Sequence, residues 1–246
     1  MNREAAKLCA LLNEAKISLS PDKAEILVRY LDRIYVENER HNLTRIARGE
    51  ATLLQLYDSL MYLHMMNHED ENSRLLDIGT GAGFPGVPLA VALGCDALLV
   101  DSVRKKTDAI GRVIQDLGVG GTIEVAATRV EDLARTHAES FDAVVARAVA
   151  DTSVLLEYAY PLLVMGGGLI LSKAPLSQDE IAHAELVSTA IGMSLVSRET
   201  IELPEGKGPR VLLRYEKTGT SSIALPRRAG MATKRPLYAM LERRMR

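Results

Sequence analysis

From Arg74 onward, short apolar segments alternate with helical segments, and this alternation limits the possible folds more than any other feature. Helix-like stretches near 85–94, 104–117, 129–136 and 152–164 separate the first five segments. Strands joined through helices pair in parallel, whereas the last two segments flank PEGKGP as a hairpin would. We therefore predict an α/β fold with a doubly wound, mostly parallel, seven-stranded sheet. The seven predicted strands are RLLDI, DALLVD, IEVAA, FDAVVAR, GGLILSK, SLVSRETIEL and RVLLRYE.

The chain before this sheet is predicted to be helical. In SPDKAEILVRYLDRIYVENER, Ser20 suits an N-cap, Pro21 suits the first helical position, and apolar residues recur on one face. A second helix is predicted over EATLLQLYDSLMYLHMM, and the polar stretch NHEDENS ends the helical part. The predicted organisation is an N-terminal helical cap at 1–73, an α/β domain at 74–217 and a basic C-terminal segment at 218–246.

Composition is that of an ordinary globular protein, with 246 residues of which 47% are hydrophobic and 25% charged. No signal peptide or membrane-spanning run is apparent, so we expect a cytoplasmic protein without membrane contact. Cys9 and Cys95 have no metal-like spacing and are predicted to be packing residues. His64 and His68 lie four residues apart but lack a third ligand, so no metal site is predicted.

Glycines follow the first predicted strand in a pattern that indicates a ligand-binding loop. DIGTGAG fits the D-x-G-x-G-x-G loop used for S-adenosylmethionine, while GAGFPG fits the dinucleotide pattern G-x-G-x-x-G. The carboxylate of Asp77 would repel a pyrophosphate but not a sulfonium cofactor that carries an amino group. The residues therefore favour S-adenosylmethionine, while a dinucleotide-dependent oxidoreductase and a glycine turn that binds nothing remain alternatives.

Ligands of doubly wound folds lie beyond the carboxyl ends of the strands, so the residues at those ends are candidate site residues. Asp101 follows the second predicted strand, 22 residues after Gly79, where it could accept hydrogen bonds from ribose hydroxyls. The stretch 128–132, Arg147 and Lys173 follow the next three strands.

Several short motifs occur in an order that resembles one family. They are NLTRI, DSL, DIGTGAGFPGVPLA, DSVRKK, TRVED, ARAVA, LSKA and LPRRAGMATKRPL. The chain resembles the glucose-inhibited division protein B family over nearly its whole length. Members of that family are bacterial small-subunit ribosomal RNA guanine-N(7) methyltransferases, which implies the fold of class I S-adenosylmethionine-dependent methyltransferases.

The resemblance implies roles for individual residues. Gly79 and Phe84 would contact S-adenosylmethionine, Val130 and Glu131 would hold its adenine edge, and Arg147 would reach its methionine end or the substrate. The predicted cofactor-binding set also includes Gly81, Gly83 and Asp101. We name no catalytic acid or base, because N(7) of guanine attacks through a lone pair and has no proton to lose.

The C-terminal segment has an uneven share of the chain's positive charge. Net charge is −2, yet residues 225–246 hold seven Arg or Lys and one Glu, with Arg227 and Arg228 just before Gly230. A basic segment on a near-neutral chain predicts phosphate contacts, and a solvated terminal helix is the alternative. The family resemblance implies that the partner is small-subunit ribosomal RNA or an assembling ribosomal subunit, and we expect the chain to act as a monomer. The predicted RNA-binding residues are Asn42, Arg129, Arg147, Lys173, Arg227, Arg228 and Lys234.

Two departures from the family pattern leave alternatives open. Family members commonly have Arg-His three residues ahead of the Asp-Ser pair, where this chain has Leu54 and Gln55, and Ala146 stands where Ser is usual. A role of the N-terminal helices in RNA binding is thus less firmly implied than the cofactor site. The alternatives are a methyltransferase of the same fold that acts on a small molecule or a protein, and a non-catalytic RNA-binding ribosome-assembly factor.

Overall fold

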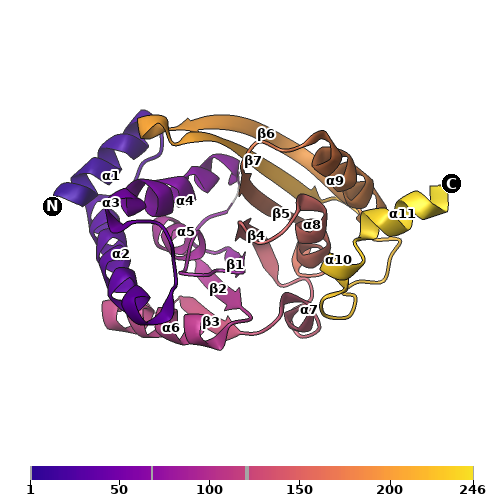
Figure 1. Ribbon diagram of the computed structural model, residues 1–246, viewed down its shortest axis with the longest axis horizontal. Helices are drawn as coiled ribbons and strands as arrows, with labels where there is room; N and C mark the ends of the chain where they lie inside the picture. Colours follow the sequence, from indigo (N-terminus) through magenta and orange to yellow (C-terminus); the bar gives the residue numbers. More distant parts are fainter. Residues whose placement is uncertain (1, 68, 120–121, 246) are drawn as a thin grey trace. The chain divides into compact units, whose positions relative to one another are not determined.

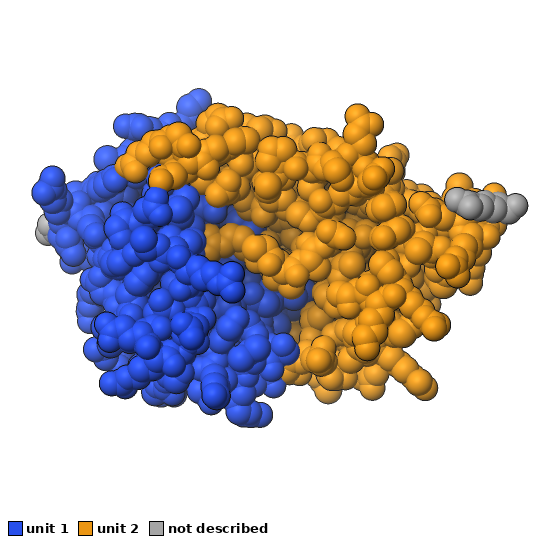
Figure 2. All heavy atoms as spheres, in the orientation of Figure 1, with its two compact units in different colours: residues 1–127 blue, residues 128–246 orange. Residues whose placement is uncertain are grey.

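The computed structural model describes residues 2–67, 69–119 and 122–245. It divides into two compact units, residues 1–127 and 128–246, which Figure 2 shows in different colours. His68 lies outside the described residues, so the structure does not describe the predicted His64–His68 relation.

The N-terminal helices of the first unit begin and end close to the predicted positions (Figure 1). Ser20 caps the long second helix, because its hydroxyl accepts a hydrogen bond from the Lys23 amide at 3.3 Å. The predicted helix over residues 50–66 is a continuous helical rod whose middle part is a π-helical turn. The bounds are α1 Arg3–Glu14, α2 Pro21–His41, α3 Arg48–Ala51, η1 Thr52–Tyr57, α4 Asp58–Leu60 and η2 Met61–Met65.

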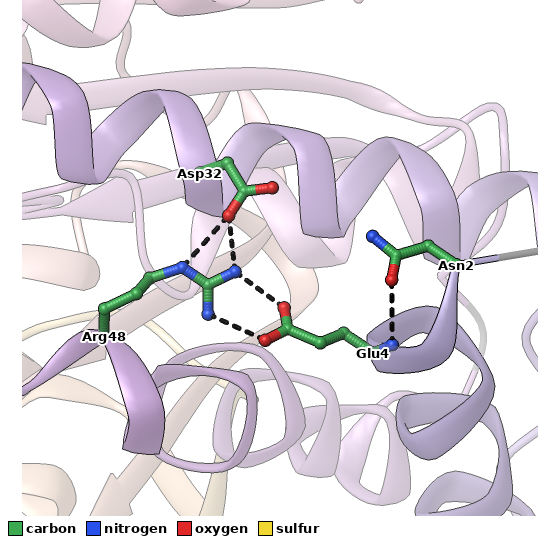
Figure 3. A network of polar contacts seen from close by, with 4 residues as sticks. All are labelled: Asn2, Glu4, Asp32 and Arg48. Carbon is green, nitrogen blue, oxygen red and sulfur yellow. Dashed lines mark hydrogen bonds and ion pairs between the residues drawn. The ribbon is translucent and has the colours of Figure 1, made fainter.

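Arg48 joins three of these helices (Figure 3). Its guanidinium on α3 binds Glu4 of α1, with Nη2 2.6 Å from Oε2, and Asp32 of α2, with Nε 3.0 Å from Oδ1. Asn2 accepts a hydrogen bond from the Glu4 amide at 3.1 Å and caps α1. All three charged side chains are partly exposed, so each pair contributes about 1 kcal/mol or less and mainly fixes the helix arrangement.

The first unit contains three parallel strands in the order β3-β2-β1. Helix α6 packs on β2 and β3 and also on α2. Each strand has the predicted position. The apolar runs of β1 and β2 are buried on both faces, whereas β3 at the end of the strand order is buried only at Ile123. The bounds are β1 Arg74–Ile78, α5 Gly86–Leu93, β2 Asp96–Asp101, α6 Arg104–Leu117 and β3 Ile123–Ala127.

The second unit contains four strands in the order β4-β5-β7-β6. β4 and β5 are parallel, and β7 pairs antiparallel with both β5 and β6, as the hairpin pattern predicted. The seven strands thus form the mostly parallel sheet that was expected. The bounds are α7 Val130–Leu133, β4 Phe141–Arg147, α8 Thr152–Ala159, β5 Leu163–Lys173, α9 Gln178–Ile191, β6 Met193–Leu203, η3 Pro204–Gly206, β7 Gly208–Lys217, α10 Met231–Lys234 and α11 Leu237–Met245.

Two helices of the second unit are shorter than predicted. α8 was expected over 152–164 but ends at Ala159, two residues before Pro161, whose ring and missing N–H cannot continue a helix. α7 was expected over 129–136 and ends at Leu133. After α8, strand β5 begins four residues earlier than the apolar pattern indicated, because Leu163 pairs with Phe141 across a bulge.

A buried lysine closes one end of the second unit's strands. Lys217, the last residue of β7, donates hydrogen bonds to Glu139 at 2.9 Å, to the Leu163 carbonyl at 2.8 Å and to the Tyr160 carbonyl at 3.2 Å. Its ammonium also lies 4.4 Å from the centre of the Tyr160 ring. The hydrogen bond from Lys217 lowers the pKa of the Glu139 carboxyl. A fully buried cation is tolerated here because every donor has an acceptor.

Candidate cofactor site

The loop between β1 and α5 has a backbone that favours glycine. Gly79, Gly81 and Gly83 have φ values of 69°, 59° and 85°, in the left-handed region that L side chains rarely adopt. The amides of Gly79 and Thr80 both donate to the Val100 carbonyl of β2, at 2.8 and 3.0 Å. These bonds fix the start of the loop against the neighbouring strand.

Asp77 holds the two ends of the loop together from below. The Asp77 side chain is fully buried. Its Oδ2 accepts hydrogen bonds from the Thr80 hydroxyl at 2.7 Å and from the Gly86 amide at 2.9 Å. A Cβ on Gly86 would lie 2.7 Å from the same oxygen, so glycine is required there for close approach. Asp77 therefore shapes the loop from inside the protein.

Helix α2 supports the middle of the loop, which the sequence did not reveal. Tyr30 is fully buried and its hydroxyl donates to the Ala82 carbonyl at 2.9 Å. Phe84 is also buried and meets the Tyr30 ring edge to face, with centroids 5.7 Å apart. Burial and the nearby charge of Asp77 raise the pKa of the Tyr30 hydroxyl well above its usual value. Phe84 packs beneath the loop, and its contact with a cofactor stays a prediction.

Asp101 joins the end of β2 to the glycine loop. Its Oδ2 accepts a hydrogen bond from the Gly81 amide at 3.2 Å, and its Oδ1 accepts one from the Val103 amide at 2.9 Å. The carboxylate is half-buried, and each oxygen has a second lone pair for a ligand. A Cβ on Gly81 would meet nothing closer than the Gly79 carbonyl at 3.9 Å, so the missing side chain leaves room beside Asp101.

These observations fit S-adenosylmethionine. The open glycine backbone allows close approach, and the carboxylate of Asp101 can accept hydrogen bonds from vicinal hydroxyls. The carboxylate of Asp77 already accepts hydrogen bonds from Thr80 and from the Gly86 amide. These donors are therefore not available to the pyrophosphate of a dinucleotide.

Two candidate residues of the second unit lie in α7. Val130 and Glu131 are its first two residues, and both are buried. Oε1 of Glu131 accepts a hydrogen bond from the Gly230 amide at 2.7 Å, so the basic C-terminal segment contacts this carboxylate. Both residues come shortly after the carboxyl end of β3, where ligand contacts were expected.

Two further candidates end strands of the second unit. Arg147 is the last residue of β4 and is half-buried, in register with Ser172 of β5. Lys173 is the last residue of β5, and its ammonium pairs with Glu180 and donates to the Ala150 carbonyl at 3.1 Å. Lys173 thus already has partners within its own unit.

Arg227 is directed into the second unit rather than toward the surface. Its Nε and Nη2 bind Oε1 and Oε2 of Glu157 at 2.7 and 2.5 Å, and its Nη1 donates to the Arg235 carbonyl at 2.8 Å. The side chain is 15% exposed, whereas Arg228 is exposed. The Arg227 guanidinium is therefore already bound by Glu157 and the Arg235 carbonyl, which does not favour the predicted phosphate contact. The sequence contains one sign of this ion pair, because the acidic residue Glu157 lies within the otherwise apolar stretch TSVLLEYAY.

The remaining predicted RNA contacts lie at the surface. Arg129, Lys234 and Asn42 are exposed. Asn42 also ends α2 in the left-handed conformation, with φ 48°, so capping and ligand contact are compatible there. Gln55, one of the two departures from the family pattern, is buried and donates to the Thr44 hydroxyl at 2.9 Å.

Two absences hold for the described parts of the chain. Over residues 2–67, 69–119 and 122–245, no three or more His, Cys, Asp or Glu side chains gather as metal ligands would. None of the helices in these same ranges is long and apolar enough to cross a membrane.

The fold and the glycine loop are those of the class I S-adenosylmethionine-dependent methyltransferases. Among solved structures, geranyl diphosphate methyltransferase in complex with GPP and sinefungin has a TM-score of 0.58 at 12% identity, covering 70% of this chain and 80% of that one. The same enzyme in complex with SAM has a TM-score of 0.56 at 13% identity, covering 71% and 92%. At such identities these likenesses concern the fold alone.

Sequence comparison supplies the family. The family model for rRNA small subunit methyltransferase G, GidB, matches residues 23–204. The "Ribosomal RNA small subunit methyltransferase G" of Desulfitobacterium hafniense is 38% identical over 225 residues, covering 90% of this chain and 92% of that protein. The protein of the same name from Gloeobacter violaceus is 40% identical over 220 residues, covering 86% and 87%. This chain belongs to the GidB family, which confirms the predicted family, fold class and cofactor class.

Proposed function

We propose that this enzyme transfers the methyl group of S-adenosylmethionine to N(7) of a guanine in small-subunit ribosomal RNA. The observation that carries the proposal is the open glycine backbone at Gly81 next to the carboxylate of Asp101, in a chain of this family. The enzyme would act as a monomer in the bacterial cytoplasm, on ribosomal RNA or an assembling subunit.

The residues of the chain would work by positioning. Gly79 and Gly81 allow close backbone approach. Asp101, whose Oδ2 accepts the Gly81 amide, would also accept hydrogen bonds from the ribose hydroxyls. The cofactor supplies an electrophilic methyl group when bound. The attacking nitrogen has a lone pair and no proton, so alignment replaces general base catalysis, and alignment can contribute about 7–11 kcal/mol.

RNA contacts are proposed for the exposed residues Asn42, Arg129, Arg228 and Lys234. Arginine and lysine side chains neutralise phosphates, and asparagine can donate to phosphate or base edges. Arg147 remains a candidate for either the cofactor or the RNA, because it ends a parallel strand. Lys173 and Arg227 are not included, since Glu180 and Glu157 already neutralise them.

The proposed reaction is tested by incubating the purified chain with S-adenosylmethionine and either naked small-subunit ribosomal RNA or isolated small subunits. Mass spectrometry of the nucleosides should find 7-methylguanosine, and mass spectrometry of nuclease fragments should place it at one position. Methylation of a different atom or molecule would favour another methyltransferase activity of the same fold. RNA binding without any methyl transfer would favour a ribosome-assembly factor.

The Asp101→Asn variant tests the cofactor site. Asparagine keeps an acceptor near the Gly81 amide but removes the charge, so S-adenosylmethionine should bind more weakly by about 1.5–3 kcal/mol, the range for hydrogen bonds that involve a charged group. Calorimetry with S-adenosylmethionine and with NAD measures this. Asp108→Asn, on the exposed side of α6, is the matched control and should bind normally. An unchanged affinity in a folded Asp101→Asn variant would remove Asp101 from the site.

A further inference from the structure

Two buried carboxylates of the second unit face the basic C-terminal segment. Glu157 of α8 is 4% exposed and forms the two-pronged ion pair with Arg227. Glu131 of α7 is 6% exposed and accepts the Gly230 amide. A lone carboxylate at this depth would be strongly destabilising, so the segment supplies donors that the two acids require.

Both carboxylates belong to one electrostatic cluster. Tyr158 follows Glu157 on α8, and burial together with the charges of Glu131 and Glu157 raises the pKa of its hydroxyl to about 12. The charges of Arg129 and Arg227 oppose this effect. The Tyr158 hydroxyl therefore lies within the electrostatic influence of both acids and of Arg227.

The C-terminal segment forms a closed loop over this cluster. We call residues 225–235 the C-terminal latch. The two ends of the latch are joined by the hydrogen bond that Nη1 of Arg227 donates to the Arg235 carbonyl at 2.8 Å. Between these residues, Gly230 has φ 77° and turns the chain into α10, which packs on α8. Arg227 thus holds both the latch itself and the helix beneath it.

Glu131 has a position and a free acceptor that suit a ligand contact. α7 begins three residues after the end of β3, and the carboxyl ends of parallel strands are where ligands of this fold bind. Within residues 2–67, 69–119 and 122–245, the structure records a donor for Oε1 of Glu131 and none for Oε2. The latch therefore fixes one oxygen and leaves the other to accept a hydrogen bond.

We propose that the C-terminal latch positions Glu131 for S-adenosylmethionine, with Arg227 as the positioning residue that anchors the latch to Glu157. This inference rests on the proposed function. In this proposal Arg227 contributes to cofactor affinity, whereas the exposed Arg228 contacts RNA.

Comparison of Arg227→Ala with Arg228→Ala tests the proposal, because the two residues are adjacent and only the first is held by Glu157. Calorimetry at 25 °C should show that Arg227→Ala binds S-adenosylmethionine roughly tenfold more weakly, which corresponds to about 1.4 kcal/mol. In methylation assays its KM for S-adenosylmethionine should rise by the same factor, while kcat stays near the wild-type value. Arg228→Ala should bind the cofactor as the wild type does.

The more conservative Arg227→Lys keeps the test decisive if the alanine variant does not fold. Lysine keeps the charge but not the planar fork, so cofactor affinity should fall by an intermediate factor of about three. Unchanged cofactor affinity in a folded Arg227 variant, with only a lower melting temperature, would overturn the proposal. A weaker affinity in Arg228→Ala equal to that in Arg227→Ala would also overturn it. If the wild-type chain does not bind S-adenosylmethionine, the proposed function itself fails, before any variant is compared.

Discussion

At the scale of single residues, the contact between Tyr30 and the glycine loop determines which side chains the loop tolerates. Tyr30 donates to the Ala82 carbonyl, and a Cβ on Gly83 would lie 2.0 Å from the Tyr30 hydroxyl oxygen. Gly83 also has φ 85°. The position therefore excludes side chains through both backbone conformation and space.

Gly83→Ala should lower the free energy of unfolding by about 2–3 kcal/mol. The left-handed backbone costs roughly 1–2 kcal/mol, and displacement of Tyr30 sacrifices a hydrogen bond worth about 1 kcal/mol. Urea unfolding measures the change. The double variant Tyr30→Phe, Gly83→Ala should be less destabilised than the sum of the single variants, because the clashing oxygen is absent.

Gly111→Ala is the matched control for this prediction. Gly111 lies inside α6, and a Cβ there would meet no atom within 4 Å. Alanine should stabilise the protein by up to about 1 kcal/mol, because glycine is a poor helix former. If both alanine variants changed stability by the same amount and sign, the Tyr30 contact would not be the cause.

At the scale of elements, Glu180 connects α9 to the start of α8 and the end of β5. Its Oε1 accepts hydrogen bonds from the Thr152 amide at 3.0 Å and the Thr152 hydroxyl at 2.8 Å, and pairs with Lys173. Burial by itself raises the pKa of the Glu180 carboxyl, but the hydrogen bonds from Lys173 and Thr152 outweigh burial and lower it. Glu180 therefore favours the folded state as long as it is ionised.

This lowered pKa predicts a contribution to stability that acid removes. Because the folded-state pKa lies below the unfolded value of about 4.3, the contribution is complete above that value and disappears as the pH falls through the folded pKa. Glu180→Gln should be less stable than the wild type at pH 7, and the difference should shrink below about pH 4. Urea unfolding from pH 7 to pH 3 measures it. Glu185→Gln, exposed on the same helix, should show no such trend, and a constant difference for Glu180→Gln would contradict the assignment.

At the scale of the whole molecule, charge is concentrated at the end of a chain whose net charge is only −2. In the second unit the C-terminal segment is anchored at several points, including the stack of Tyr238 on His183, with ring centroids 3.6 Å apart. These contacts hold α11 against α9 and leave Arg228 and Lys234 exposed. Arg228 and Lys234 are therefore exposed on a segment that is itself anchored to the second unit.

RNA binding should consequently depend on salt through the outer cations. The double variant Arg228→Ala, Lys234→Ala should reduce the slope of log affinity against log salt by about 0.7–0.9 for each lost phosphate contact. Filter binding across a salt series measures the slope, with cofactor affinity expected to stay unchanged. Arg198→Ala, an exposed cation of β6, should leave the slope as in the wild type. Equal slopes for all three proteins would mean that the segment does not contact RNA.

The sequence by itself determined the features that depend on neighbouring residues. The alternation of apolar runs predicted every strand, and Ser20 and Pro21 predicted the start of α2. The glycine spacing predicted the loop after β1, whose Gly79, Gly81 and Gly83 have positive φ values in the structure. Such signals are local, because hydrogen-bonding geometry and conformational preference act over a few residues. The same locality explains why Asp101 could be placed at the end of its strand.

Only the tertiary structure decided which side chains meet across long stretches of chain. Tyr30 reaches the loop from 52 residues away, and Arg227 meets Glu157 across 70 residues. Periodicity marks Tyr30 as one of many buried residues and Arg227 as one of several cations, without naming their partners. Burial makes the difference, because a desolvated hydroxyl or carboxylate must find a donor or acceptor wherever the fold brings one. That requirement turned Arg227 inward to Glu157 and left Arg228 at the surface.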